Sequence, residues 1–176
     1  MVSVHGTGPA PIRTDRSRGQ ALVEFALVAP LLFLLILGTI EAGRFIFFHE
    51  LLSNATREGA RFAIVHGADS VCPSGPPAPG TSACDLTGEN VKSAVQDAAM
   101  SMAGLGDLFL HDPVWTSRGD LANPSAGDAS TGTNDRGEYV TVFVDFTYRP
   151  LVSEVVNVSV LPEITISAES TLVINY

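Results

Sequence analysis

An uncharged apolar stretch near the N-terminus constrains the fold of this chain more than any other feature. The 16 residues between Glu24 and Glu41 carry no ionisable side chain. As a helix they measure about 24 Å, which is shorter than the ~30 Å hydrocarbon core of a bilayer. Including residues 20–24 extends the helix to 21 residues and about 31 Å. The sequence therefore predicts one membrane-spanning helix over residues 20–41, with the Glu24 carboxylate inside the apolar zone.

A carboxylate at that depth is costly, so we interpret Glu24 as a functional residue. An ionised side chain in hydrocarbon needs a partner of opposite charge. No Lys or Arg occurs between Arg18 and Arg44. The partner is therefore expected to come from outside this helix.

Gly19, followed after four residues by Glu24, Phe25 and a long apolar run, resembles the processing site of type IV-type prepilins, most closely the Flp/Tad class. The resemblance implies that a membrane prepilin peptidase cuts between Gly19 and Gln20. Residues 1–19 would then be a removed cytoplasmic leader, and Glu24 would be the fifth residue of the mature chain. It further implies that the new α-amine of Gln20 in one subunit pairs with Glu24 of its neighbour and sets the assembly register.

The similarity extends to the TadE-like pilus-assembly proteins, whose N-terminal pattern is present from Arg18 to Arg61. The shared motifs are Val23-Glu-Phe-Ala26, Pro30, Glu41-Ala-Gly-Arg44, Asn54-Ala55 and Arg57-Glu-Gly-Ala-Arg61. They cover about a quarter of the chain; beyond them only the general layout and a Tyr148-Arg-Pro-Leu151 junction are similar. The resemblance implies a minor pilin or pseudopilin that acts in pilus assembly and surface adherence. Its implied partners are other pilin and pseudopilin subunits, the prepilin peptidase and pilus platform proteins.

The distribution of charge predicts the orientation in the membrane. Residues 1–19 contain three Arg and one Asp, a net charge of +2, so the remainder of the −9 chain carries −11. Basic residues before the span and acidic residues after it place the N-terminus in the cytoplasm and residues 42–176 outside. The acidic body also argues against a nucleic acid as partner, since binding a polyanion requires a basic patch.

Two other kinds of protein share some of these features. An uncleaved helix anchoring an extracytoplasmic binding domain is the main alternative, and a tethered hydrolase is another. A conventional secretory signal fits poorly, because bulky Ile40 stands where its cleavage site needs a small residue. No nucleophile elbow, phosphate loop, dinucleotide fingerprint or zinc-protease helix is present. We therefore expect a structural protein, not an enzyme, with no cofactor and no metal.

The rest of the chain predicts a pilin-like α+β fold. Apolar residues continue at helical spacing to His66, so the spanning helix is expected to continue as an amphipathic half over residues 42–66. A second short helix is expected over residues 88–104, with Thr87 as its cap and Gly104 at its end. Residues 105–176 are expected to hold loops and a small antiparallel sheet. Its two main strands alternate over 140–148 and 164–174, and a short strand is expected around Val114.

Residues 67–87 are rich in Pro, Gly and Ser and contain both cysteines, Cys72 and Cys84. Outside the cytoplasm this pattern predicts a disulfide-closed loop. A zinc site built from the two cysteines with His66 and His111 matches no familiar ligand spacing. Carboxylates of the polar stretch 117–138 suit calcium in kind but also lack a recognised spacing, so a solvated surface loop is favoured there.

Overall fold

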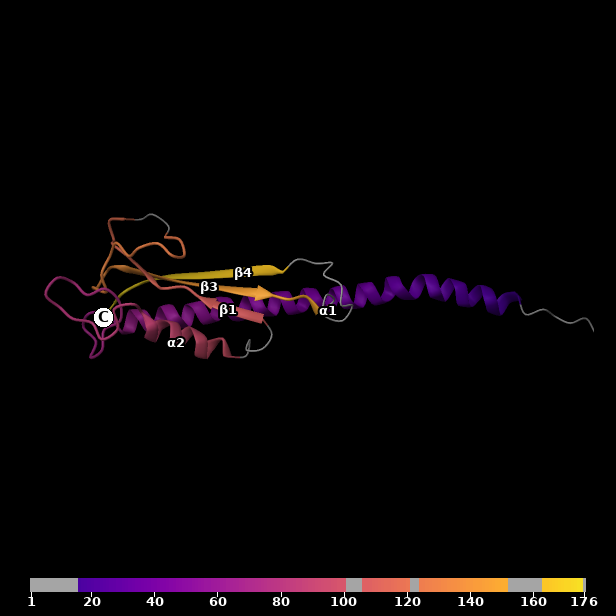
Figure 1. Cartoon of the computed structure of the whole chain (residues 1–176), viewed down its shortest axis with the longest axis horizontal. Helices are drawn as coiled ribbons and strands as arrows, with labels where there is room; N and C mark the ends of the chain where they lie inside the picture. Colours follow the sequence, from indigo (N-terminus) through magenta and orange to yellow (C-terminus); the bar gives the residue numbers. More distant parts are fainter. Residues whose placement is uncertain (1–15, 101–105, 121–123, 152–162, 176) are drawn as a thin grey trace, which may run out of the picture. The chain divides into compact units, whose positions relative to one another are not determined.

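The computed structural model describes residues 16–100, 106–120, 124–151 and 163–175 (Figure 1). Its elements are α1 (Arg16–Val65), α2 (Glu89–Ala98), β1 (Gly106–Leu110), β2 (Val114–Thr116), β3 (Tyr139–Tyr148) and β4 (Ile164–Val173). A long N-terminal helix, a second short helix and a small antiparallel sheet confirm the predicted α+β class. The described chain divides into two compact units, which separate between Ile40 and Glu41.

The first unit contains the apolar part of α1. Most of its large apolar side chains, among them Leu22, Phe33 and Leu34, are more than half exposed. By length and composition α1 is able to cross a membrane, and no other helix of the described ranges is. Pro30 lies within the helix. An apolar surface of this kind needs a non-aqueous environment, because exposing it to water is unfavourable.

The sheet of the second unit is built around β3. Strand β4 pairs with β3 along its whole length, from Tyr139 opposite Val173 to Tyr148 opposite Ile164. Strands β1 and β2 pair with different parts of β3, β1 from Val144 to Tyr148 and β2 from Tyr139 to Thr141. Since β4 occupies one edge of β3, β1 and β2 share the other edge one after the other. All pairings are antiparallel.

The edge that β1 and β2 share contains a break. Leu110 pairs with Val144 and Val114 with Thr141, so three residues on this edge face two on β3. This is the count of a β-bulge, and it lets Pro113 lie on the edge without interrupting a ladder bond. Strand β2 was predicted from the sequence, whereas β1 was not. The reason is that Gly106 and Asp107 interrupt the apolar alternation that marks a strand.

One face of β3 packs on the second half of α1 (Figure 1) and forms the core. The predicted inward face of β3 is confirmed, because its five side chains are at most 1 % exposed: Val140, Val142, Val144, Phe146 and Tyr148. The opposite face, predicted to be solvated, is partly buried as well, at Thr141 and Phe143. From α1 the buried hydrophobic residues are Phe48, Leu52, Ala55, Ala60 and Ala63. Their helical spacing places one stripe of α1 against the sheet.

Helix α2 packs against α1 through Val91 and Val95, which are fully buried. Gly59 of α1 permits this approach. A Cβ built at Gly59 would clash with a methyl group of Val95, and it would lie 3.5 Å from Val142. The glycine of the Arg57-Glu-Gly-Ala-Arg61 motif is therefore a packing requirement of this fold.

The predicted boundaries of α2 were partly wrong. Gly88, with φ of 80°, occupies the N-cap position, and Thr87 does not cap the helix. The helix ends at Ala98, where the Ala99 N–H is shared between the carbonyls of Val95 and Gln96, as is common at helix ends. The predicted terminator Gly104 lies outside the described residues.

The polar stretch 117–138 was predicted to be a solvated surface loop, and this was wrong for part of it. Asn134 is only 1 % exposed. Its backbone N–H donates to Pro76 O at 2.7 Å, and its carbonyl accepts from Ala68 N at 2.9 Å. The N–H groups of Thr131 and Gly132 both donate to the Trp115 carbonyl. This segment therefore fills the position beside β2 where another strand would otherwise satisfy the backbone.

Candidate functional site

The residues of the expected processing site lie at the start of α1. Gly19 and Gln20 are exposed, and a Cβ added at Gly19 would meet no heavy atom within 4 Å. The glycine is therefore not required by packing within the chain, in contrast to Gly59. Open space on this side leaves the Gly19–Gln20 bond reachable by another protein.

Glu24 lies one helical turn after Gln20 on the same side of α1. Its side chain is exposed and makes no hydrogen bond or ion pair with any residue in the described ranges. The next cation along α1, Arg44, is already paired with Glu41 at 3.5 Å. Within the described part of this chain, the Glu24 carboxylate is thus free to meet a partner supplied by another molecule.

Glu41, where the apolar run ends, is the centre of a polar network that joins α1 to the end of β3. The Tyr148 hydroxyl donates a hydrogen bond to Glu41 Oε1. The Leu151 N–H donates to the same oxygen at 3.2 Å. Arg44 Nη1 lies 3.5 Å from the other oxygen, Oε2. The half-buried Glu41 carboxylate thus meets three donors: Arg44 from its own helix, and Tyr148 and Leu151 from the end of β3 and the residues after it.

Aromatic rings surround this network. The Arg44 guanidinium lies 5.5 Å from the Tyr148 ring centroid and 5.7 Å from that of Phe48, distances suited to cation–π attraction. The Tyr148 ring also meets Phe45 edge-on at 5.9 Å and Phe48 at 5.6 Å. These contacts orient the Arg44 and Tyr148 side chains at the end of β3, which is called the base of the sheet below.

The environment of Tyr148 changes its acidity. Burial disfavours the phenolate, and the hydrogen bond to Glu41 adds to this effect. Together they outweigh the nearby Arg44 cation and raise the pKa of Tyr148 to about 12. The hydroxyl is therefore protonated, and acts as a donor, over the whole physiological range.

The two cysteines lie together, with Cys72 and Cys84 paired across 5.2 Å between their Cα atoms, a separation suited to a disulfide. Ser74, within the loop they enclose, forms an isolated parallel bridge with Asp85, the residue that follows Cys84. The Asp85 carboxylate accepts from Gly88 N at 2.9 Å and Asn90 N at 2.7 Å. Asp85, and not Thr87, is thus the residue that caps α2.

The pKa of Asp85 reflects this role. Burial on its own would raise the pKa. The backbone N–H groups of residues 87–90 together outweigh that effect and hold the pKa below its usual 3.8. Asp85 is therefore a carboxylate at neutral pH, and it stabilises the start of α2 both by hydrogen bonds and by its charge.

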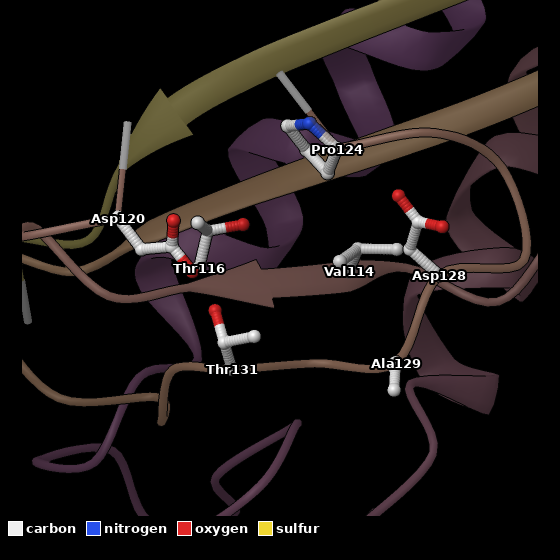
Figure 2. Close-up of a pocket in the computed structure, with 7 residues that line it drawn as sticks. All are labelled: Val114, Thr116, Asp120, Pro124, Asp128, Ala129 and Thr131. Atoms are coloured by element: carbon white, nitrogen blue, oxygen red, sulfur yellow. The ribbon is translucent and has the colours of Figure 1, made fainter. Parts of the chain in front are cut away.

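A pocket of about 280 Å³ lies between β2 and the loop after residue 123. Figure 2 shows its lining, with the carboxylates of Asp120 and Asp128 at opposite sides and Thr116 and Thr131 between them. The Asp128 carboxylate accepts a hydrogen bond from the N–H of Ser125, at 2.6 Å. In the described ranges no three His, Cys, Asp or Glu side chains come together in a group able to hold a metal ion.

The two histidines considered for zinc form no metal-holding group with the cysteines in the described ranges, and their rings have other neighbours. The His66 ring stacks on Phe62, with centroids 3.9 Å apart. His111 Nε2 lies 2.8 Å from Asp145 Oδ2 on the outer face of the sheet. Burial would raise the pKa of Asp145, but contacts with Ser167 and His111 together lower it. His66 and His111 thus take part in two separate contacts, one with Phe62 and one with Asp145.

Comparison with known proteins identifies the N-terminal segment. A family model described as TadE-like protein matches residues 19–61. This segment is TadE-like. The match contains both the expected processing site and the Glu41–Arg44 motif, and it supports a protein associated with the Tad pilus. No curated protein and no solved structure matches the chain.

The structure joins the TadE-like segment to a residue that lies outside it. The predicted site residues Gly19, Gln20 and Glu24 lie together on α1, whereas Cys72 and Cys84 lie in a separate loop of the second unit. Glu41 and the Tyr148 junction stand out in the sequence as separate motifs, and their contact was not predicted. Two features of the sequence could have indicated this contact. Glu41 is the charged residue that ends the apolar run, and Tyr148 is the hydroxyl-bearing residue that ends an alternating strand.

Proposed function

We propose that this protein is a minor pilin or pseudopilin of a Tad-type pilus, acting in filament assembly and surface adherence. In this proposal α1 stores the protein in the membrane until assembly. The protein is a structural subunit and not an enzyme, and no step requires a cofactor. Its partners are other pilin and pseudopilin subunits, the prepilin peptidase and the platform proteins of the pilus.

One observation carries the proposal: Gly19 precedes Glu24 by five positions inside the TadE-like segment, and both residues are exposed on α1. A peptidase that cuts after Gly19 creates an α-amine at Gln20. That amine carries a positive charge at neutral pH, because amino termini titrate near pH 7.7–8.0. Cleavage therefore supplies the cation that the described part of the chain does not offer to Glu24.

The new amine and Glu24 are separated by about one helical turn within a subunit. When two subunits pack side by side, the amine of one and the carboxylate of the other meet only at one axial offset. Each charge is costly when buried alone, and the pair is tolerated. The pairing thus specifies register as well as association.

The charge balance supports the orientation that pilus assembly requires. The leader carries +2 and the remainder −11, which favours a cytoplasmic N-terminus and an extracytoplasmic second unit. In that location the Cys72–Cys84 pair is exposed to an oxidising environment. Processing at the cytoplasmic face and folding outside are then compatible.

Intact-mass measurement of the protein from cells with an active prepilin peptidase tests the proposal. We expect a chain that begins at Gln20, reduced or lost when Gly19 is replaced by Ala or by a bulky residue. A peptidase-deficient strain is the control, in which residues 1–19 should remain. Retention of residues 1–19 in the presence of the peptidase would instead support an uncleaved anchor for an extracytoplasmic binding domain.

A further inference from the structure

Several apolar side chains remain exposed beyond the predicted end of the membrane span. Ile46 is 62 % and Phe47 is 57 % exposed, and Phe45 is 37 % exposed. They follow Glu41, where the span predicted from the sequence ends, and Arg44. Large apolar groups side by side on a surface mark a contact with a partner or a membrane.

The two charges do not face outward, so they do not end the apolar surface of α1. Glu41 and Arg44 pair with each other, and both contact Tyr148 on the sheet side of the helix. Their side chains are only 17 % and 24 % exposed. At 100° per residue, Ile46 and Phe47 lie on the side of α1 turned away from the sheet. On that side of α1, within the second unit, the first charge is Glu50.

The base of the sheet limits how far hydrocarbon can extend. Tyr148 contacts residues 41–48 of α1, and the next residue, Arg149, bonds Asp107 at 2.7 Å and lies 3.4 Å from Glu163. All three charged side chains are more than half exposed. Charges of this kind fit the headgroup layer but not the acyl chains. The hydrocarbon boundary therefore lies close to Arg44.

We propose that the base of the second unit rests in the headgroup layer of the bilayer, with Phe45, Ile46 and Phe47 as its interfacial anchors. Trp and Tyr are the residues most enriched at this depth of a membrane, and Phe and aliphatic side chains of interfacial helices also insert at the boundary between headgroups and acyl chains. The hydrocarbon then contains residues 25–43, which measure about 28 Å against a core of about 30 Å. Glu24 falls at the opposite surface, at headgroup level.

This placement differs from the span of residues 20–41 expected from the sequence. That span buries the Glu24 carboxylate in hydrocarbon and leaves Phe47 about 10 Å outside it. The proposed placement avoids both costs, and the stored protein then needs no partner for Glu24. The inference rests on α1 crossing a membrane and not on the proposed pilin role, since pairing of Glu24 with a neighbour concerns the assembled state.

Depth-dependent fluorescence quenching distinguishes the two placements. Single Leu22→Trp, Leu34→Trp and Phe47→Trp variants of the full chain would be reconstituted in phosphatidylcholine vesicles with lipids brominated at different acyl positions. All three sites are more than half exposed, so the substitutions leave the core intact. The only native tryptophan, Trp115, is 1 % exposed, and its signal is measured in the unsubstituted protein.

In the proposed placement Leu34 is central, and Leu22 and Phe47 lie about 18 and 20 Å from the bilayer centre. We expect both end variants to be quenched to a similar extent, and most strongly by bromines near the headgroup. Leu34→Trp should respond most strongly to bromines near the chain end. Strong mid-chain quenching of Leu22→Trp with no quenching of Phe47→Trp would overturn the proposal. That result would place Ile46 and Phe47 against another protein chain or in water.

Discussion

Tyr148, the last residue of β3, donates a hydrogen bond to Glu41 of α1 across 107 positions of sequence. The contact ties the end of the central strand to the helix at the point where the apolar run stops. Because the Leu151 N–H donates to the same oxygen, the chain leaving β3 is held there as well. Glu41 therefore acts as a structural anchor of the second unit.

Replacing Tyr148 by Phe is expected to destabilise the second unit by about 1–3 kcal/mol, because Glu41 loses a donor in a half-buried position. Urea unfolding followed by the fluorescence of Trp115 measures this change. Tyr139→Phe is the matched control, since Tyr139 makes no side-chain hydrogen bond within the described ranges, and its effect should stay within about 0.5 kcal/mol. Equal effects of the two substitutions would contradict the anchoring role.

The same tyrosine predicts a loss of stability at high pH. Its pKa rises from 10.0 to about 12 on folding, so the folded protein holds the phenolic proton more tightly. This contribution is complete below pH 10 and is lost as the pH rises from 10 to 12, in total about 2–3 kcal/mol. The Phe variant should lack this part of the alkaline decrease, whereas the Tyr139 control should retain it.

Asp85→Asn is expected to cost about 1 kcal/mol at pH 7, because the amide is a weaker acceptor for the Gly88 and Asn90 N–H groups and has no charge. The folded state lowers the pKa of Asp85 below 3.8, so this stabilisation is present above pH 4 and is lost as the pH falls through the folded pKa. The difference in the free energy of unfolding between the Asp85→Asn variant and the unsubstituted protein should therefore disappear at acid pH. Asp97→Asn, at an exposed site on the same helix, should show no such gap in urea unfolding at pH 7.

Cys72 and Cys84 are expected to form a disulfide in the mature protein. Breaking a ring of this length costs roughly 3 kcal/mol in the loop-entropy model. Thiol labelling of native, non-reduced protein should find neither cysteine free. After reduction, amide hydrogen exchange should increase within residues 67–87 and remain slow in the buried half of α1. Labelling of both thiols before reduction would show that the bond is not formed.

Gly59→Ala is expected to destabilise the packing of α1 on α2 by about 1–3 kcal/mol, since the new methyl group clashes with Val95. A second substitution, Val95→Ala, should recover part of the loss when both are present. Gly43→Ala is the control, because a Cβ at Gly43 meets nothing within 4 Å. Thermal unfolding of the four variants measures the coupling, and strictly additive effects would exclude the clash.

Glu24→Gln is expected to leave membrane insertion and cleavage intact and to abolish pilus assembly, because the Gln20 amine of a neighbour would be buried unpaired at a cost of several kcal/mol. Glu24→Asp should be intermediate, since its charge is kept but lies one methylene short. Crosslinking to other pilins and pilus yield, with processing followed in the same cells, provide the measurement. Glu50→Gln, also exposed on α1, is the control, and normal assembly of the Glu24→Gln variant would remove the register role.

Local pattern in the sequence was sufficient to predict the main elements of this protein. The uncharged run after Glu24 predicts a long apolar helix, and the alternation from Val140 to Tyr148 predicts a strand with one buried face. The order of Gly19 and Glu24 identified the candidate processing site, since that signal depends only on spacing along the chain. Each of these features is decided by neighbouring residues and by the period of a helix or strand.

Contacts between distant residues were decided only by the tertiary structure. Glu41 stands at the end of an apolar run and Tyr148 at the end of a strand, and neither position specifies the other as its partner. The 1 % exposure of Asn134 was decided in the same way, because its backbone is bonded to Ala68 and Pro76, more than fifty positions earlier in the chain. Hydrogen bonds and close packing depend on position in space to within a few tenths of an ångström, which periodicity along the sequence does not encode.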